Sequence, residues 1–302
     1  MDINKYQASA VGTQQFDSKT EQGITIALLG LSGEVGELLT EYKKKMRDGE
    51  SYNMFRDKII EEMGDIMWYL SSIAAYEDIE FSEILKRNLD KVVDRWHDIN
   101  DLGEPLFEHS YLDDDCVEGE QLPREFVLEF KEETDKNNDK KVIISVNGKQ
   151  FGDHLKDNSY DPDFYRYHDI FHFSYVVILG WSPVVRGFFG CKRKKDYKRD
   201  EVEDGGRAIA IDEAISVLIF EYARNHNFFK GIGGVDYDLL RNIKLLTKNL
   251  EVKKCTLKQW EQAILLGFGI WHELKEKRTG RVVCSMHDKS MIFEDVKILK
   301  PA

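Results

Sequence analysis

The chain has 302 residues, 55 acidic and 43 basic, with a formal net charge of -12, and its 42% hydrophobic content excludes wholesale disorder. The acidic balance disfavours a nucleic-acid partner, because duplex affinity comes from basic side chains that displace counterions at phosphates. No run of about 18 uncharged apolar residues predicts a membrane span, and no secretory signal pattern opens the chain, so we expect a cytoplasmic protein without a membrane partner.

The first hundred residues are expected to be helical. Only five prolines occur, the first of them Pro105, and proline is the residue that most strongly interrupts a helix. Apolar residues recur at steps of three and four within residues 24–42, 59–73 and 81–96. The pattern predicts three long helices that form an all-α bundle, a first domain over residues 1–104.

The chain changes character after this bundle. Residues 105–123 are rich in acidic side chains and predict a solvated linker. In residues 124–302, apolar residues first alternate as in strands, around 126–130 and 142–146, and then return to helical spacing. Helices are expected over 164–179, 208–223, 239–246 and 260–274, followed by a hairpin over 281–293. We therefore predict a mainly α protein whose second domain, 124–302, has an α+β fold.

Four carboxylates stand out in the helical segment. Glu34 and Glu37 are three residues apart, hence on one helix face, and Glu62 and Asp65 repeat this spacing on the next helix. If the two helices pack antiparallel, the four groups converge in the groove between them. None of the four has a basic residue at i+4, whereas Glu41 has Lys45 there and is expected to be an ordinary surface glutamate.

Such a cluster calls for a cation. Like charges gathered among apolar neighbours repel one another and lose hydration, at several kcal/mol per ion unless a cation compensates. A hard divalent ion with oxygen ligands suits this role: Mg²⁺ is the simplest, and Mn²⁺ is an alternative. Gly33, Gly36 and Gly64 lie beside the carboxylates, and each costs a helix about 1 kcal/mol relative to alanine, which indicates that a ligand or another backbone comes close. The competing interpretation is a solvated acidic face.

The order of these motifs resembles that of the MazG-type all-α nucleoside triphosphate pyrophosphohydrolases. The resemblance covers about residues 5–100 and lies in the segments LGLSGEVGELLTEYKKK and EEMGDIMWYL and in a third helix with Asn88, Lys91 and Arg95. It implies an all-α domain that usually forms a homodimer, or a higher homo-oligomer, and hydrolysis of a nucleoside triphosphate to a monophosphate and pyrophosphate. It also implies that magnesium is held by Glu34, Glu37, Glu62 and Asp65.

This chemistry assigns roles to the side chains. Magnesium neutralises charge as the bond between the α and β phosphates breaks, and a carboxylate or the metal activates the attacking water. Glu34, Glu37 and Asp65 are expected to bind the metal, and Glu62 is either a ligand or the general base. The candidates for substrate binding, each with a solvated surface position as its alternative, are Lys44, two turns beyond Glu37, and the third-helix residues Asn88, Lys91 and Arg95.

The second domain carries two further signals. His168 and His172 are spaced i, i+4 on one helix with Asp169 beside them, which allows a second metal site or a phosphohydrolase site. Acidic pairs at 203–204 and 212–213 are candidates to complete it, and histidines packed in an aromatic core are the alternative. The basic run 191–199 is either a phosphate or nucleic-acid contact or, more simply, a solvated loop.

These signals leave a second hypothesis for the whole chain. The helical domain would then bind a nucleotide or dimerise without catalysing a reaction. The second domain would act on a partner or carry its own metal-dependent activity.

Overall fold

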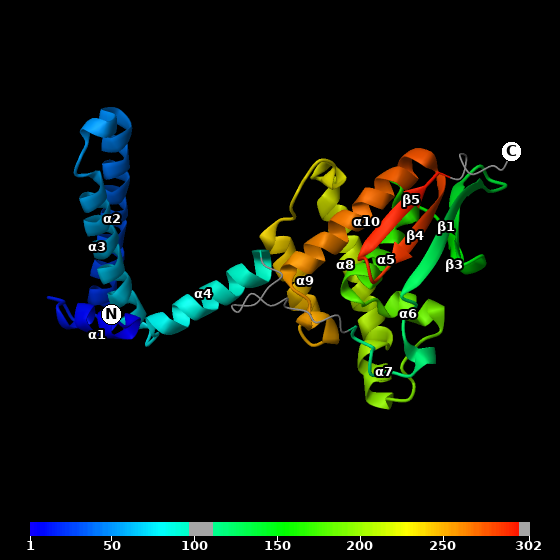
Figure 1. Ribbon diagram of the computed structural model, residues 1–302, viewed down its shortest axis with the longest axis horizontal. Helices are drawn as coiled ribbons and strands as arrows, with labels where there is room; N and C mark the ends of the chain where they lie inside the picture. The colour runs from blue at the N-terminus through cyan, green and yellow to red at the C-terminus, as the bar shows by residue number, and fades with distance from the viewer. Residues whose placement is uncertain (97–110, 296–302) are drawn as a thin grey trace. The chain divides into compact units, whose positions relative to one another are not determined.

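The computed structural model describes residues 1–96 and 111–295 and divides into two units, Met1–Val92 and Val93–Ala302. The predicted fold class is confirmed, since the first unit is helical and the second combines helices with an antiparallel sheet (Figure 1). The expected domain boundary at residue 104 lies outside the described residues.

The first unit is built on a hairpin of two long helices. Helices α2 and α3 pack along each other, and the shorter α1 packs on α3. The apolar periodicity predicted α2, α3 and α4 but not α1, whose short sequence INKYQASAVG has few apolar residues. The elements are α1 (Ile3–Gly12), α2 (Glu21–Asp48), the 3-10 turn η1 (Gly49–Ser51), α3 (Phe55–Tyr76) and α4 (Phe81–Trp96).

Helix α4 starts against α1. Gln7 Oε1 accepts a hydrogen bond from Phe81 N at 2.9 Å, and Asn4 Oδ1 accepts one from Ser82 N at 3.0 Å, so side chains of α1 satisfy the first amides of α4. Among the described residues, α4 has no contact with α2 or α3 as extensive as the one those two share. Its apolar residue Leu85 is accordingly 54% exposed.

The segment Glu21–Ser51, which contains α2, is long and apolar enough to cross a membrane, judged by its length and composition alone. This is weak evidence, because core helices of water-soluble proteins pass the same test. The segment also carries Glu34 and Glu37.

The second unit contains a five-stranded sheet whose neighbours are all antiparallel, in the order β3-β2-β1-β4-β5. The alternating patterns predicted β1 and β2, and the expected hairpin near the C-terminus is confirmed by β4 and β5. Strand β3 was not predicted, because its sequence KQFGDHL contains only two large apolar residues, Phe151 and Leu155, with a glycine and polar residues between them. The strands are β1 (Glu125–Thr134), β2 (Lys140–Val146), β3 (Lys149–Leu155), β4 (Thr279–Ser285) and β5 (Ser290–Glu294).

Helices cover one face of this sheet and supply most of the core (Figure 1). All eleven residues of α5 are buried, and α10 packs along it. The helices are α5 (Asp169–Leu179), α6 (Pro183–Phe189), α7 (Tyr197–Glu203), α8 (Gly206–Arg224), α9 (Tyr237–Thr247) and α10 (Leu257–Lys277); the 3-10 turns are η2 (Glu118–Glu120), η3 (Tyr165–Tyr167), η4 (Asn227–Phe229) and η5 (Glu251–Lys254).

The acidic stretch is part of the second unit, and its described residues do not form a solvated linker. Asp113 is 1% exposed and accepts hydrogen bonds from Leu122 N at 2.8 Å, Arg124 Nη2 at 2.7 Å and Arg186 Nη2 at 2.7 Å. Residues 105–110 of the expected linker lie outside the described residues. The segment folds back because its carboxylate satisfies two guanidinium groups at once.

The basic run 191–199 is likewise more than a solvated loop. Arg193 is 1% exposed and forms ion pairs with Asp204 at 2.6 Å and Glu251 at 2.6 Å. Arg199 forms ion pairs with Asp115 at 2.9 Å and with Glu251 at 3.3 Å. Two guanidinium groups of the run therefore bind carboxylates within the protein, and neither is a free contact for phosphate.

Two glycines of α10 allow a matched test of core packing. A Cβ added at Gly267 would stand 2.8 Å from Ser174 Oγ and 3.1 Å from a Phe171 ring carbon, whereas one added at Gly269 would meet no described atom within 4 Å outside α10's own nearby backbone and its chain neighbours. We expect Gly267→Ala to destabilise the protein by about 1–3 kcal/mol and Gly269→Ala to stabilise it by up to about 1 kcal/mol. Urea unfolding of the two variants measures this difference, and equal effects would contradict the tight α5–α10 contact.

Candidate metal and active site

The carboxylates of α2 and α3 converge as the helix spacing predicted. One carboxylate oxygen each from Glu34, Glu62 and Asp65 lies within 4.8 Å of the other two. A bound Mg²⁺ keeps its oxygens at about 2.0–2.1 Å, so ligands on opposite sides of the ion are about 4.2 Å apart. The three oxygens would have to move closer together around an ion, and the all-oxygen donor set fits a hard divalent cation.

Glu37 lies one turn along α2, is exposed, and is outside this closest group. It acts on the group through its charge. Burial raises the pKa of Glu34, and the negative charges of Asp65 and Glu37 raise it further. Burial also raises the pKa of Glu62, with added contributions from the charges of Glu34 and Glu37. The four acids thus repel one another without a cation, as the sequence predicted.

The glycines beside the carboxylates face open space. Apart from the backbone of the helix itself and the neighbouring residues in the chain, no described atom lies within 4 Å of the position that a Cβ would take at Gly33, Gly36 or Gly64. The close approach of α2 to α3 is instead at Gly30, where the Tyr69 ring fills the space of a side chain. The room at the three glycines is therefore available to a ligand or to another chain.

Lys44 is held close to the acidic groove by a buried glutamate. Glu41 is 2% exposed and accepts hydrogen bonds from Lys44 Nζ, at 2.5 Å, and from the Tyr52 hydroxyl. The expectation that Glu41 is a surface residue paired with Lys45 is therefore wrong. The hydrogen bond from Lys44 lowers the pKa of Glu41, and the same bond raises the pKa of Lys44. Lys44 is thus a fixed positive charge near the groove.

The three candidates on α4 are placed differently. Asn88 and Lys91 are exposed, and α4 does not pack along α2 and α3, so the described carboxylate group contains neither of them. Arg95 belongs to the second unit and is 7% exposed; its Nη2 donates to Val235 O at 2.8 Å and to Glu261 at 2.9 Å. This buried ion pair gives Arg95 a structural role instead of the expected contact with substrate.

The structure brings the second-domain candidates together at the start of α5. His168 Nε2 lies 3.2 Å from Asp169 Oδ1, and His172 Nδ1 lies 2.8 Å from Asp212 Oδ1. Glu213 also reaches His172, at 3.4 Å. Of the two acidic pairs considered as partners, 212–213 reaches the histidines, whereas Asp204 is bound to Arg193.

Burial and charge act in opposite directions on these imidazoles. Burial lowers the pKa of His168 and outweighs the nearby charge of Asp169. Burial also opposes a charge on His172, but the carboxylates of Asp212 and Glu213 outweigh it and raise its pKa. The cluster therefore attracts positive charge.

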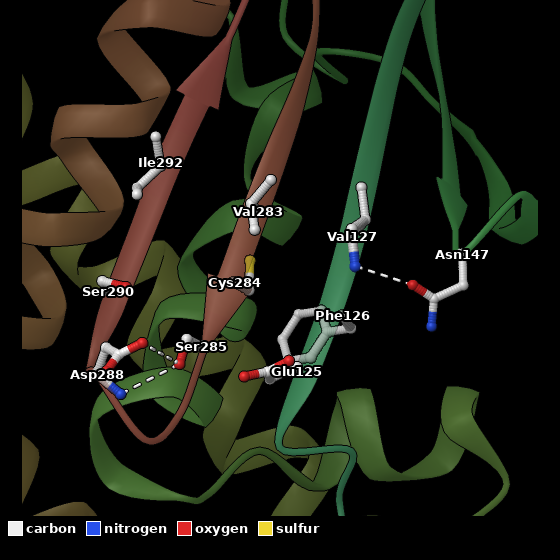
Figure 2. Close-up of a pocket in the computed structure, with 10 residues that line it drawn as sticks. All are labelled: Glu125, Phe126, Val127, Asn147, Val283, Cys284, Ser285, Asp288, Ser290 and Ile292. Carbon is white, nitrogen blue, oxygen red and sulfur yellow. Dashed lines mark hydrogen bonds between the residues drawn. The ribbon is translucent and has the colours of Figure 1, made fainter.

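A separate hollow of about 320 Å³ lies on the sheet of the second unit (Figure 2). Its lining includes the apolar side chains of Val127, Val283 and Ile292, and Asp288 there is engaged by Ser285 at 2.9 Å. It contains no histidine and none of the carboxylates described above.

Comparisons with known proteins agree with this architecture. A family model described as the MazG nucleotide pyrophosphohydrolase domain matches residues 22–99, and a MazG C-terminal domain model matches residues 107–297. The Gene 37 protein of Mycobacterium phage L5 is 34% identical over 101 residues, which make up 32% of this chain and 89% of the phage protein. No solved structure matches.

Proposed function

Because the chain belongs to the MazG family, with a nucleotide pyrophosphohydrolase domain ahead of a MazG C-terminal domain, we propose that it hydrolyses a nucleoside triphosphate to a monophosphate and pyrophosphate in the cytoplasm. The convergence of Glu34, Glu62 and Asp65 carries this proposal. A triphosphate is itself strongly negative, so an acidic groove binds it only through a cation. Mg²⁺ or Mn²⁺ fits the all-oxygen donor set.

The side chains divide the work in this reaction. A divalent cation, when bound, neutralises charge on the phosphates and lowers the pKa of a bound water. Glu34 and Asp65 hold that cation from the two helices, and Glu37 adds a ligand or negative charge one turn away. Glu62 completes the ligand set or accepts the proton of the attacking water, a role that its raised pKa favours. Lys44 stabilises charge on a phosphate oxygen.

A substrate panel tests the proposal. The full-length protein is incubated with magnesium and canonical, deoxy and oxidised or otherwise damaged nucleoside triphosphates, and released pyrophosphate is measured. We expect release from at least one of them together with the matching monophosphate. A folded protein that binds a nucleotide tightly by calorimetry without forming product would instead identify a non-catalytic nucleotide-binding module.

We also propose that the first unit functions in a homodimer. Its helices expose apolar side chains that a single copy leaves uncovered, including Leu29 at 69%, Leu39 at 59% and Met63 at 54%. Apolar surface of this extent on a water-exposed domain is typical of an interaction surface, and the carboxylates lie on the same helices. Light scattering is expected to give twice the chain mass of 35.2 kDa, and a mass of one chain would refute the dimer.

The raised pKa values predict how magnesium affects stability. In the folded protein Glu34 and Glu62 keep their protons above the ordinary value of 4.5, so ionisation as the pH rises past that value destabilises the metal-free first unit. We expect Mg²⁺ to raise the melting temperature at neutral pH and to have little effect at pH values below 4.5, where the acids are protonated. Sodium chloride of equal ionic strength is the control for scanning calorimetry. An equal shift at both pH values would count against a carboxylate site.

A further inference from the structure

A second group of metal-ligating side chains lies in the second unit. His168 directly precedes α5, His172 follows one turn later, and Glu213 projects from α8. One ligand atom from each of the three lies within 4.8 Å of the other two. Two histidines and one carboxylate form a donor set found in zinc sites. None of these residues belongs to the acidic groove of the first unit.

The orientation of the His172 ring is fixed by a buried carboxylate beside its Nδ1 atom. Its ring is fully buried, and its Nδ1 lies 2.8 Å from Asp212 Oδ1. Asp212 is also fully buried and accepts from Ser182 Oγ at 2.6 Å and from Val184 N at 3.2 Å. This arrangement places the proton of a neutral ring on Nδ1 and leaves the Nε2 lone pair free, as in carboxylate–histidine–metal triads.

The Nε2 atom of His172 is a buried polar atom without a hydrogen-bond partner among the described residues. The nearby Glu213 Oε2 lies 3.4 Å away without hydrogen-bond geometry. Buried polar groups are rarely left unpaired, so this atom calls for an explanation. A tetrahedral zinc ion with bonds of about 2.0–2.1 Å separates its ligand atoms by about 3.4 Å, which is the distance between His172 Nε2 and Glu213 Oε2.

His168 is oriented in the same way. Its Nδ1 lies 2.9 Å from the Tyr165 carbonyl oxygen, and its ring stacks on the Tyr165 ring with centroids 4.3 Å apart. Its Nε2 is thereby left for a ligand, with Asp169 Oδ1 3.2 Å away. The His168 side chain is 13% exposed and that of Glu213 is 46% exposed, so an ion can enter from solvent.

We propose that His168, His172 and Glu213 bind a divalent transition-metal ion of the zinc type, with Asp169 or a water molecule as the fourth ligand. Imidazole nitrogens favour such an ion over Mg²⁺, which prefers an all-oxygen set. Three carboxylates, those of Asp169, Asp212 and Glu213, lie beside the two imidazoles, and their negative charge favours a cation. The same carboxylates favour a proton on His172 when no metal is present, so proton and metal compete for the site.

Metal titration of the full-length protein tests the site. The protein is stripped with a chelator and titrated with Zn²⁺ and Co²⁺ in excess Mg²⁺, which occupies the carboxylates of the first unit. We expect one tightly bound Zn²⁺ and, for Co²⁺, the intense visible absorption of a four-coordinate ion. His168→Ala and Glu213→Gln are each expected to weaken Zn²⁺ binding by about 100-fold or more. Loss of an outer-shell partner alone costs about 10–100-fold in metal affinity, and loss of a direct ligand should cost at least as much.

Matched variants keep this test decisive. His154→Ala removes an exposed histidine of β3 and should leave binding unchanged. Glu213→Gln alters a partly exposed side chain, so this variant should fold even if His168→Ala does not. Circular dichroism checks the fold of each variant. The proposal fails if the wild-type protein binds neither ion, or if Glu213→Gln binds both as tightly as the wild type.

Discussion

Glu62→Gln is expected to lower the rate of pyrophosphate release by at least about 100-fold. Glutamine keeps the size of the side chain but loses its negative charge, so it binds a divalent cation weakly and cannot accept a proton from water. Either loss removes several kcal/mol of transition-state stabilisation, and each 1.36 kcal/mol is a tenfold change in rate. Steady-state kinetics on the best substrate of the panel, at saturating magnesium, measures the effect.

The same substitution should stabilise the metal-free protein. The pKa of Glu62 is raised by burial and by the surrounding acids, so its ionised form is unfavourable in the folded state at neutral pH. A neutral glutamine removes that repulsion, and the melting temperature without metal should stay equal or rise. Loss of activity in a variant that is at least as stable cannot be attributed to unfolding.

A remote glutamate provides the control. Glu50 follows α2 and forms an exposed ion pair with Lys45, with its own side chain 99% exposed. Glu50→Gln removes the same charge from the same unit and should leave the rate within about twofold of the wild type, since exposed ion pairs contribute little. If Glu62→Gln retained its activity, or if Glu62→Gln and Glu50→Gln lost activity equally, the acidic groove would not be the catalytic site.

The local pattern of the sequence predicted what neighbouring residues determine. The i, i+3 spacing of the acids put them on one face of α2 and of α3, and a short connection made those helices antiparallel neighbours. The contact between Lys44 and Glu41 depends on the rotamers of the two side chains and on Tyr52, which also donates to Glu41. Helical periodicity in the sequence gives no information on either. For that reason the pairing of Glu41 with Lys45 was wrong even though the helix was right.

Long-range charge pairing was beyond a local pattern. The sequence around Asp113 predicted a solvent-exposed side chain, yet Asp113 is buried against Arg186, about 75 residues away in the sequence. Asp115 is exposed as expected, but it too has a distant partner, Arg199, about 85 residues away. Likewise Arg95 reaches Glu261 across most of the second unit. The presence of both an acidic run and a basic run in one chain was the available signal that the two segments pair. In the structure, aspartates of the acidic run form ion pairs with arginines, one of which belongs to the basic run.

Asp113→Ala is expected to destabilise the second unit by about 3–5 kcal/mol. Arg186 is 2% exposed, and removal of Asp113 takes away its closest carboxylate while it stays away from water. Breaking a buried pair from one side carries a cost of this size, because the remaining charge loses both hydration and partner. Its more distant neighbour Asp204, at 3.6 Å, is already bound to Arg193. Scanning calorimetry of the full-length protein should show a lower transition for this unit.

The adjacent residue makes the comparison strict. The Asp114 side chain is 44% exposed and pairs with Arg124 at 3.1 Å, so Asp114→Ala should change stability by no more than about 1 kcal/mol.

Acid titration of the wild type and of Asp113→Ala gives an independent check. Burial opposes ionisation of Asp113, but hydrogen bonds from Leu122, Arg124 and Arg186 outweigh it and lower its pKa below the ordinary 3.8. Its stabilisation is therefore complete above that value and is lost as the pH falls toward the lowered pKa, so the wild type should lose more stability on acidification than Asp113→Ala. Equal effects of the two alanine variants would mean that the acidic stretch is a solvated linker after all.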